Sequence, residues 1–143
     1  MTKDQRSWNA VALVFFVCLC AGSVVLLARY ADTQPAQLGF FDLALLGLGT
    51  FRLVHLLTYD KIFEPIRTSF MVGKGGRLMK APRGWRRLMG EFLECIWCTG
   101  MWSGLFTVTI YFLGAWGRFA VVVFAVAGLG SLFQVMSKMM AER

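Results

Sequence analysis

Two cysteines three positions apart, Cys95 and Cys98, have the residue type and spacing that most directly suggest chemistry. Such a pair can close a disulfide, and at a helix N-terminus one of its thiols becomes a reactive thiolate. The pair can also supply two of the four ligands of a tetrahedral zinc ion, or it can simply pack. A reducing cytoplasm disfavours a stable disulfide, and zinc needs two further ligands. The available donors are His55, Asp60, Glu94 and the same cysteines of a second subunit.

A second group of polar residues, Arg52, His55 and Asp60, lies at the end of an apolar stretch. A charge about one and a half turns inside such a stretch is costly unless it snorkels or finds a partner. Asp60 is the first candidate partner of Arg52, and Glu94 is the second. We interpret the group as a structural cluster, with an ion or proton pathway as the alternative. His55 stays a candidate for metal or redox chemistry beside the two cysteines.

The elements that must position these residues are four apolar stretches, which cover residues 9–28, 38–57, 99–116 and 119–137. A helix needs about 20 apolar residues to cross a bilayer core. The chain is 57% hydrophobic and only 16% charged, whereas a soluble domain has roughly 25% charged residues. We therefore predict an all-α polytopic membrane protein with four transmembrane helices, forming a single membrane domain over residues 1–143.

Basic residues are concentrated between the second and third stretches. Residues 58–98 contain eight of the fifteen Lys and Arg residues. By the positive-inside rule this segment and both termini lie in the cytoplasm, and the membrane is the bacterial inner membrane. The net charge of +7 does not indicate nucleic-acid binding, because the charges flank membrane segments and are expected to contact anionic headgroups.

One part of the basic segment, residues 82–96, has the pattern of an amphipathic helix. Its apolar residues follow a helical stripe: Trp85, Leu88, Met89, Phe92 and Ile96. Its basic residues fall mostly off that stripe: Arg83, Arg86 and Arg87. We expect interfacial helices here, lying in the inner headgroup layer with Trp85 as the anchor. The alternative is a soluble helix that packs on its own protein.

Small residues mark candidate helix-packing faces, because they let helices approach closely in lipid. The second stretch contains Gly47 and Gly49, the third opens with Gly100 and Gly104 in a Gly-x-x-x-Gly pattern, and the fourth contains Gly128. These faces can serve packing within one chain or between subunits.

Three motifs together resemble the domain-of-unknown-function family 1360, which comprises small membrane proteins of bacteria and their phages. The motifs are Thr50-x-Arg52-Leu53, Thr58-x-Asp60-x-Ile62-x-x-Pro65-Ile66-Arg67 and Glu94-Cys95-x-Trp97-Cys98-x-Gly100-x-Trp102. The family's usual Cys-Pro-Trp/Tyr-Cys stands here as Cys95-Ile-Trp-Cys98, which weakens the redox interpretation. The resemblance covers residues 43–111 and implies no known reaction. It implies one cytoplasmic-face cluster of Arg52, Asp60, Arg67, Cys95, Cys98 and Trp102.

The function predicted from the sequence is a non-enzymatic, oligomeric or partner-binding membrane module without a cofactor. Partners are the bilayer and a second copy or another membrane protein. One alternative is a holin-like pore former or small channel, which conductance in liposomes would reveal. Another is a membrane thiol oxidoreductase, or a metal-binding protein with zinc, that uses Cys95 and Cys98.

Overall fold

The computed structural model describes residues 3–30, 38–74, 77–81 and 84–142. These residues form six α-helices, one short 3-10 helix and one β-hairpin. In chain order the elements are α1 (Lys3–Tyr30), α2 (Phe40–Thr58), η2 (Lys61–Phe63), α3 (Glu64–Ser69), β1 (Met71–Lys74), β2 (Arg77–Lys80), α4 (Trp85–Glu94), α5 (Ile96–Phe112) and α6 (Ala115–Ala141). The class is all-helical apart from the hairpin, which the sequence analysis did not predict.

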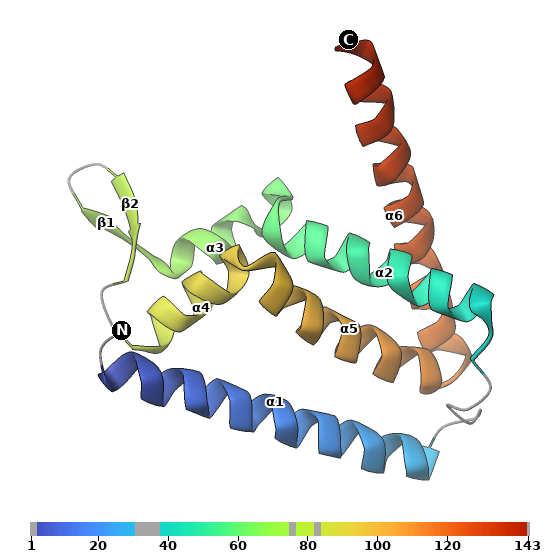
Figure 1. Cartoon of the computed structure of the whole chain (residues 1–143), viewed down its shortest axis with the longest axis horizontal. Helices are drawn as coiled ribbons and strands as arrows, with labels where there is room; N and C mark the ends of the chain where they lie inside the picture. The colour runs from blue at the N-terminus through green and yellow to red at the C-terminus, as the bar shows by residue number, and fades with distance from the viewer. Residues whose placement is uncertain (1–2, 31–37, 75–76, 82–83, 143) are drawn as a thin grey trace.

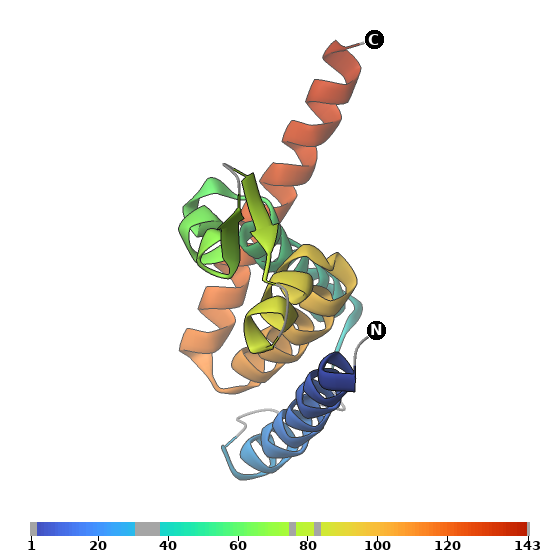
Figure 2. The ribbon, with the colours of Figure 1, turned by 90° about the vertical axis from the view of Figure 1, so that its left-hand side faces the viewer.

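Helices α1, α2 and α5 run alongside one another, and α6 crosses α2 (Figure 1). We call the end of this bundle that carries α3, α4 and the hairpin the hairpin end. The other end, where α5 turns into α6, is the turn end. The C-terminal half of α6 extends beyond the other helices in both views (Figures 1 and 2).

Three helices in the described part of the chain are each long and apolar enough to cross a membrane: Gln5–Tyr30, Phe40–Thr58 and Ala115–Ala141. A fourth span is present if α4 and α5 count together as one broken span, whose two helices meet at an angle of 88°. The observed helices overlap all four predicted spans. The third span is displaced, since its helix runs from Ile96 to Phe112 and not from residue 99 to 116.

The predicted helix over residues 82–96 is shorter in the structure. Its first two residues lie outside the described residues, α4 ends at Glu94, and Ile96 already belongs to α5. Cys95 separates the two helices with an extended backbone (φ −86°, ψ 96°), which forces the bend. A short turn also follows α5, between Phe112 and Ala115. There Gly114 has φ 118°, a conformation that glycine adopts far more readily than other residues.

Helices α2, α5 and α6 share the small hydrophobic core of Leu46, Tyr111, Phe112 and Val121. Two of the glycines singled out above lie where these helices approach most closely. A Cβ on Gly128 would come within 2.5 Å of the Leu48 carbonyl oxygen, and one on Gly49 within 3.4 Å of Val121. The close approach of α6 to the α2 backbone therefore depends on glycine at position 128, whereas a Cβ at position 49 would only reach contact distance.

The face of α5 that packs inward is not its Gly-x-x-x-Gly face. Gly100 and Gly47 have nothing within 4 Å of a built Cβ, and Gly104 meets only a Thr50 methyl group at 3.9 Å. The buried stripe of α5 follows a four-residue spacing and consists of Thr99, Ser103, Thr107 and Tyr111. Thr107 donates to the Ser103 carbonyl of its own helix, whereas Thr99 donates across the bend to the Phe92 carbonyl of α4. With their hydroxyls satisfied in this way, these small side chains let a neighbouring helix come close.

Helix α1 lies on one side of the bundle, beside α4 and α5 (Figures 1 and 2), and supplies only Leu27 to the edge of the core. Phe15 stacks on Trp102 of α5 and Phe16 meets the same ring at a tilt of 60°, with ring centroids 5.7 and 5.0 Å from that of Trp102. Most of the other large apolar side chains of α1 are exposed, including Val11, Leu13 and Val14. α1 is therefore attached by the aromatic contact with Trp102 and by Leu27, which packs against the core.

Candidate functional site

Arg52, His55 and Asp60 form a compact ionic network at the hairpin end of α2. Arg52 Nη2 donates to Asp60 Oδ2 at 2.7 Å, and His55 Nδ1 lies 3.1 Å from Asp60 Oδ1. Arg52 Nη1 is also 3.2 Å from His55 Nδ1. The Arg52 and Asp60 side chains are only 21% and 24% exposed. Partial burial strengthens this charge pair, because water screens it less than at an open surface.

Arg67 joins this network from α3 through the backbone. Its Nη1 donates to the Leu57 carbonyl at 3.0 Å and its Nη2 to the Asp60 carbonyl at 2.9 Å. The last carbonyls of a helix have no partner within the helix, and a cation there also opposes the negative end of the helix dipole. We call the four residues Arg52, His55, Asp60 and Arg67 the ionic clamp. The clamp fixes the chain direction where α2 leaves the bundle.

The cysteines lie in a different environment, at the bend between α4 and α5. Cys95 and Cys98 are joined as a disulfide with Cα atoms 5.3 Å apart, so Cys18 and Cys20 are the chain's free cysteines. Cys95 caps α5, and its Sγ accepts a hydrogen bond from the Cys98 N–H at 3.2 Å. Within the described residues no three His, Cys, Asp or Glu side chains gather to hold a metal ion, so the predicted zinc ligands are not brought together.

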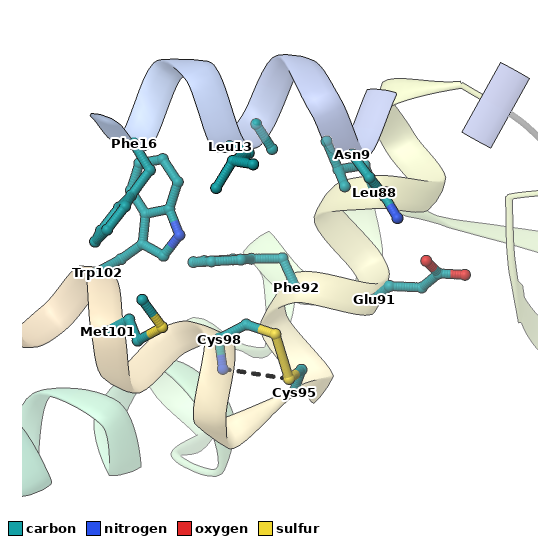
Figure 3. A pocket seen from close by; sticks show the side chains of 11 residues that line it. Asn9, Leu13, Phe16, Leu88, Glu91, Phe92, Cys95, Cys98, Met101 and Trp102 are labelled. Carbon is teal, nitrogen blue, oxygen red and sulfur yellow. Dashed lines mark hydrogen bonds between the residues drawn. A yellow bond between two sulfur atoms is a disulfide. The ribbon is translucent and has the colours of Figure 1, made fainter. Parts of the chain in front are cut away.

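The disulfide borders a cavity of about 370 Å³ between α1, α4 and α5 (Figure 3). We call this space the disulfide cavity. Its lining is almost wholly apolar and comprises Ala12, Leu13, Phe16, Leu88, Phe92, Met101 and Trp102 besides the cysteines, with Asn9 and Glu91 as polar members. Trp102 packs edge-on against Phe92 at 5.6 Å, so the rings of three elements meet there.

The structure thus divides the single cluster implied by the resemblance into two. Arg52, Asp60 and Arg67 belong to the ionic clamp, whereas Cys95, Cys98 and Trp102 line the disulfide cavity. A second cavity of about 610 Å³ touches both regions, because it is lined by His55 of the clamp and by Met101, which also lines the disulfide cavity. Glu94, the second candidate partner of Arg52, is exposed at the last residue of α4.

The basic and aromatic residues proposed to face lipid also tie α4 to its neighbours. Trp85 packs edge-on against Phe70 at 5.6 Å, and Arg86 Nη2 donates to the Ser69 carbonyl at 2.5 Å. Arg87 forms an ion pair with Glu91 one turn later at 2.8 Å. Arg83 lies outside the described residues.

A polar contact that the sequence analysis missed lies at the turn end. Tyr111 donates to Asp42 Oδ1 at 2.5 Å, and the Gly39 N–H donates to Asp42 Oδ2 at 2.9 Å. The Arg118 guanidinium lies over the Tyr111 ring at 5.4 Å from its centroid. One sequence signal could have indicated that Tyr111 is buried. It is the last of four hydroxyl residues spaced four apart along α5, after Thr99, Ser103 and Thr107. This contact joins the start of α2 to α5 and α6.

A family model for proteins of unknown function, DUF1360, matches residues 45–137, which is well over half of the chain. Sporulation protein YjcA of Bacillus subtilis (strain 168) is 30% identical over 111 residues, covering 70% of this chain and 94% of that protein. The UPF0713 protein YngL of the same organism is 34% identical over 76 residues, covering 48% of this chain and 56% of its own length. No solved structure matches the chain. The family match confirms the resemblance, and it leaves α1 outside.

Proposed function

The chain belongs to the family of proteins of unknown function DUF1360, and from this premise we propose that it is a four-span, inner-membrane assembly module. In this proposal residues 58–98 and both termini are cytoplasmic. The module holds a basic segment against the inner leaflet and associates with a second copy of itself. The observation that carries the proposal is the ionic clamp, which attaches that segment rigidly to the end of α2.

The proposed topology follows from helix length and charge. α5 has 17 residues and is about 25 Å long, which is just enough for a bilayer core when the interfacial α4 leads into it. α6 has 27 residues and is about 40 Å long, so its last turns would leave the core. Lys138 and Glu142, an exposed pair 3.8 Å apart, would then lie at the inner headgroups.

The ionic clamp supports a structural role because its polar groups are already used. The Asp60 carboxylate accepts a hydrogen bond from Arg52 and lies 3.1 Å from His55 Nδ1, and Arg67 donates to two backbone carbonyls. An arginine within a span normally needs such a partner to be tolerated. The clamp therefore orients the chain that follows α2, and with it the α3–α4 segment, where Trp85 and Arg86 support binding to anionic lipid.

Association with a second copy is supported by the exposed half of α6. Phe133, Met136 and Met140 are 61%, 56% and 70% exposed and follow one helical face. Within the described residues, this half of α6 contributes none of the core positions. Packing inside the bundle favours a module over a pore, because the hydroxyl stripe of α5 is buried and Tyr111 is paired with Asp42.

Native mass spectrometry of the full chain, released from mild detergent, tests this proposal. We expect a single defined oligomer for the unmodified chain, and a shift towards monomer when Phe133 and Met136 are both changed to alanine. Val14→Ala on α1, which removes a similarly exposed apolar side chain, is the matched control. A monomer at every protein-to-detergent ratio would overturn the proposed assembly.

A further inference from the structure

The cysteine pair lies where a thiol is activated. Cys95 is the N-cap of α5, and the Cys98 N–H points to its sulfur at 3.2 Å. Backbone N–H groups and the positive end of the helix dipole stabilise a thiolate at this position. Cys98 is exposed and Cys95 is partly buried, so the pair is within reach of a reaction partner. These features permit redox chemistry but do not by themselves identify a partner.

The disulfide cavity supplies the second observation. Its volume of about 370 Å³ lies within the range of small-molecule sites, roughly 300–1,000 Å³. The Phe16, Phe92 and Trp102 side chains form an aromatic wall beside the sulfurs (Figure 3). An aromatic wall favours a flat, apolar ring that can stack or meet ring edges.

Access to this cavity is from the side of α1. Leu13 lines the cavity and is 64% exposed, and Phe15 and Phe16 of α1 contact Trp102 of α5 beside it. A molecule dissolved in the bilayer can reach the sulfurs between these helices without crossing an aqueous phase. Asn9 also lines the cavity, and its Oδ1 already accepts from Gln5, so its amide nitrogen is the group that can donate to a carbonyl.

We infer that Cys95 and Cys98 form a redox-active pair whose electron acceptor is a lipid-soluble quinone bound in the disulfide cavity. In the reaction two thiols lose their S–H bonds and one S–S bond forms. The two electrons and two protons pass to the quinone, whose two carbonyl oxygens become the hydroxyls of a quinol. Exchange with two thiols of a cytoplasmic dithiol protein then reduces the disulfide again.

The cytoplasmic placement proposed above explains why an oxidant is required. Cytoplasmic thiols are kept reduced, and disulfides found there are usually transient and catalytic or redox-sensing. A quinone fits the cavity because it is flat, apolar and accepts two electrons, as the pair requires. The inference goes beyond the proposed assembly, and the chemistry can be tested whatever the topology or subunit number.

The test uses the full chain in detergent, with Cys18→Ser and Cys20→Ser so that Cys95 and Cys98 supply the only thiols that are counted. The protein is reduced, freed of reductant and mixed without oxygen with a fully substituted benzoquinone carrying a decyl tail. Such a ring cannot alkylate thiols at a free ring position. We expect two thiols lost per quinol formed, a rate that saturates with quinone, and no quinol from Cys98→Ser.

Two variants locate the acceptor. Leu13→Trp should fill the cavity from α1 and raise the half-saturating quinone concentration at least about tenfold, and Trp102→Leu should act in the same direction by removing a ring contact. Trp97→Leu is the matched control, because Trp97 lies on the same helix, is 81% exposed and does not line this cavity. The rate at which a soluble disulfide reoxidises the cysteine pair should be equal in these three variants. Equal rates would show that the substitutions leave the pair itself intact.

Two results would overturn the inference. One is that quinone oxidises the pair without saturation and no faster than it oxidises free cysteine in the same detergent. The other is that the Leu13→Trp and Trp102→Leu variants both have the same half-saturating quinone concentration as the protein without these substitutions. In either case the disulfide is a structural link at the α4–α5 bend.

Discussion

The ionic clamp and the disulfide cavity lie at the same end of the bundle, yet their residues are used in opposite ways. The carboxylate and guanidinium groups of Asp60, Arg52 and Arg67 are all engaged within the protein. The disulfide instead borders a cavity of about 370 Å³ with apolar walls. Neutralised charges hold helices in place, whereas a disulfide beside a cavity leaves room for a ligand. We therefore expect stability to depend on the first region, and the inferred quinone chemistry to depend on the second.

The largest expected effect is the loss of Asp60. Asp60→Ala leaves Arg52 partly buried without its carboxylate, which should lower the free energy of unfolding by about 3 kcal/mol. Unfolding by SDS titration in mild detergent measures this change. Glu142→Gln, which removes an exposed carboxylate from a 3.8 Å pair, is the control and should change stability by less than about 0.5 kcal/mol. An equal effect of the two substitutions would contradict the role of the clamp.

The next effect concerns Arg67. Arg67→Ala removes two charge-assisted hydrogen bonds to the Leu57 and Asp60 carbonyls, and we expect a loss of about 2 kcal/mol. Amide hydrogen exchange should rise first at the end of α2 and in α3. Arg67→Lys tests whether the planar guanidinium is needed, because one ammonium group cannot reproduce its two fixed, diverging N–H donors. Lysine should recover less than half of the lost free energy of unfolding. Full recovery by lysine would show that charge alone is enough.

Gly128 tests how closely α6 must approach the clamp. A Cβ there would lie 2.5 Å from the Leu48 carbonyl oxygen and 3.3 Å from the Arg52 Cβ, so the helices must move apart. Gly128→Ala should therefore cost about 1.5 kcal/mol by overpacking. Gly130, two residues later, has nothing within 4 Å of a built Cβ, and Gly130→Ala should not destabilise the protein. The difference between the two melting temperatures is the measurement, and no difference would argue against the α2–α6 contact.

The smallest expected effect is that of reducing the disulfide. The loop that it closes has a sequence separation of only three residues, so it restricts the unfolded chain little, and reduction should cost about 1 kcal/mol. Thermal unfolding with and without reductant, at fixed detergent, measures the cost. A loss larger than that of Asp60→Ala would reverse the comparison and make the disulfide the main support of this end.

The sequence predicted the local features of both regions better than the distant ones. The spans carry a strong apolar signal, and Arg52 and Asp60 are only eight residues apart, so their pairing follows from one helix end. The Asp42–Tyr111 contact joins residues 69 positions apart, and no local pattern connects them. The bend at Cys95 was missed because the apolar stripe of α4 continues to Ile96 without a glycine or proline at the break.

Packing faces were hard to predict for a physical reason. In a membrane protein, lipid-facing and protein-facing residues are equally apolar, so hydropathy does not separate them. Gly100 and Gly104 matched a packing motif but point away from close contacts, whereas Thr99 and Ser103 are buried. Cavities also depend on helices from distant parts of the sequence. The disulfide cavity has α1 as one wall, and nothing in the Cys-x-x-Cys motif indicates that helix.

The most direct test of the comparison measures the rate of quinol formation against quinone concentration, together with the quinol formed per two thiols lost, in three forms of the reduced protein. The forms are the Cys18→Ser, Cys20→Ser background alone, with Asp60→Asn, and with Leu13→Trp. The account predicts one quinol with saturable kinetics in the first two forms, even though Asp60→Asn is less stable, and loss of saturation with Leu13→Trp. Loss of quinol formation with Asp60→Asn while Leu13→Trp reacts normally would contradict it, because the chemistry would then depend on the clamp and not on the cavity.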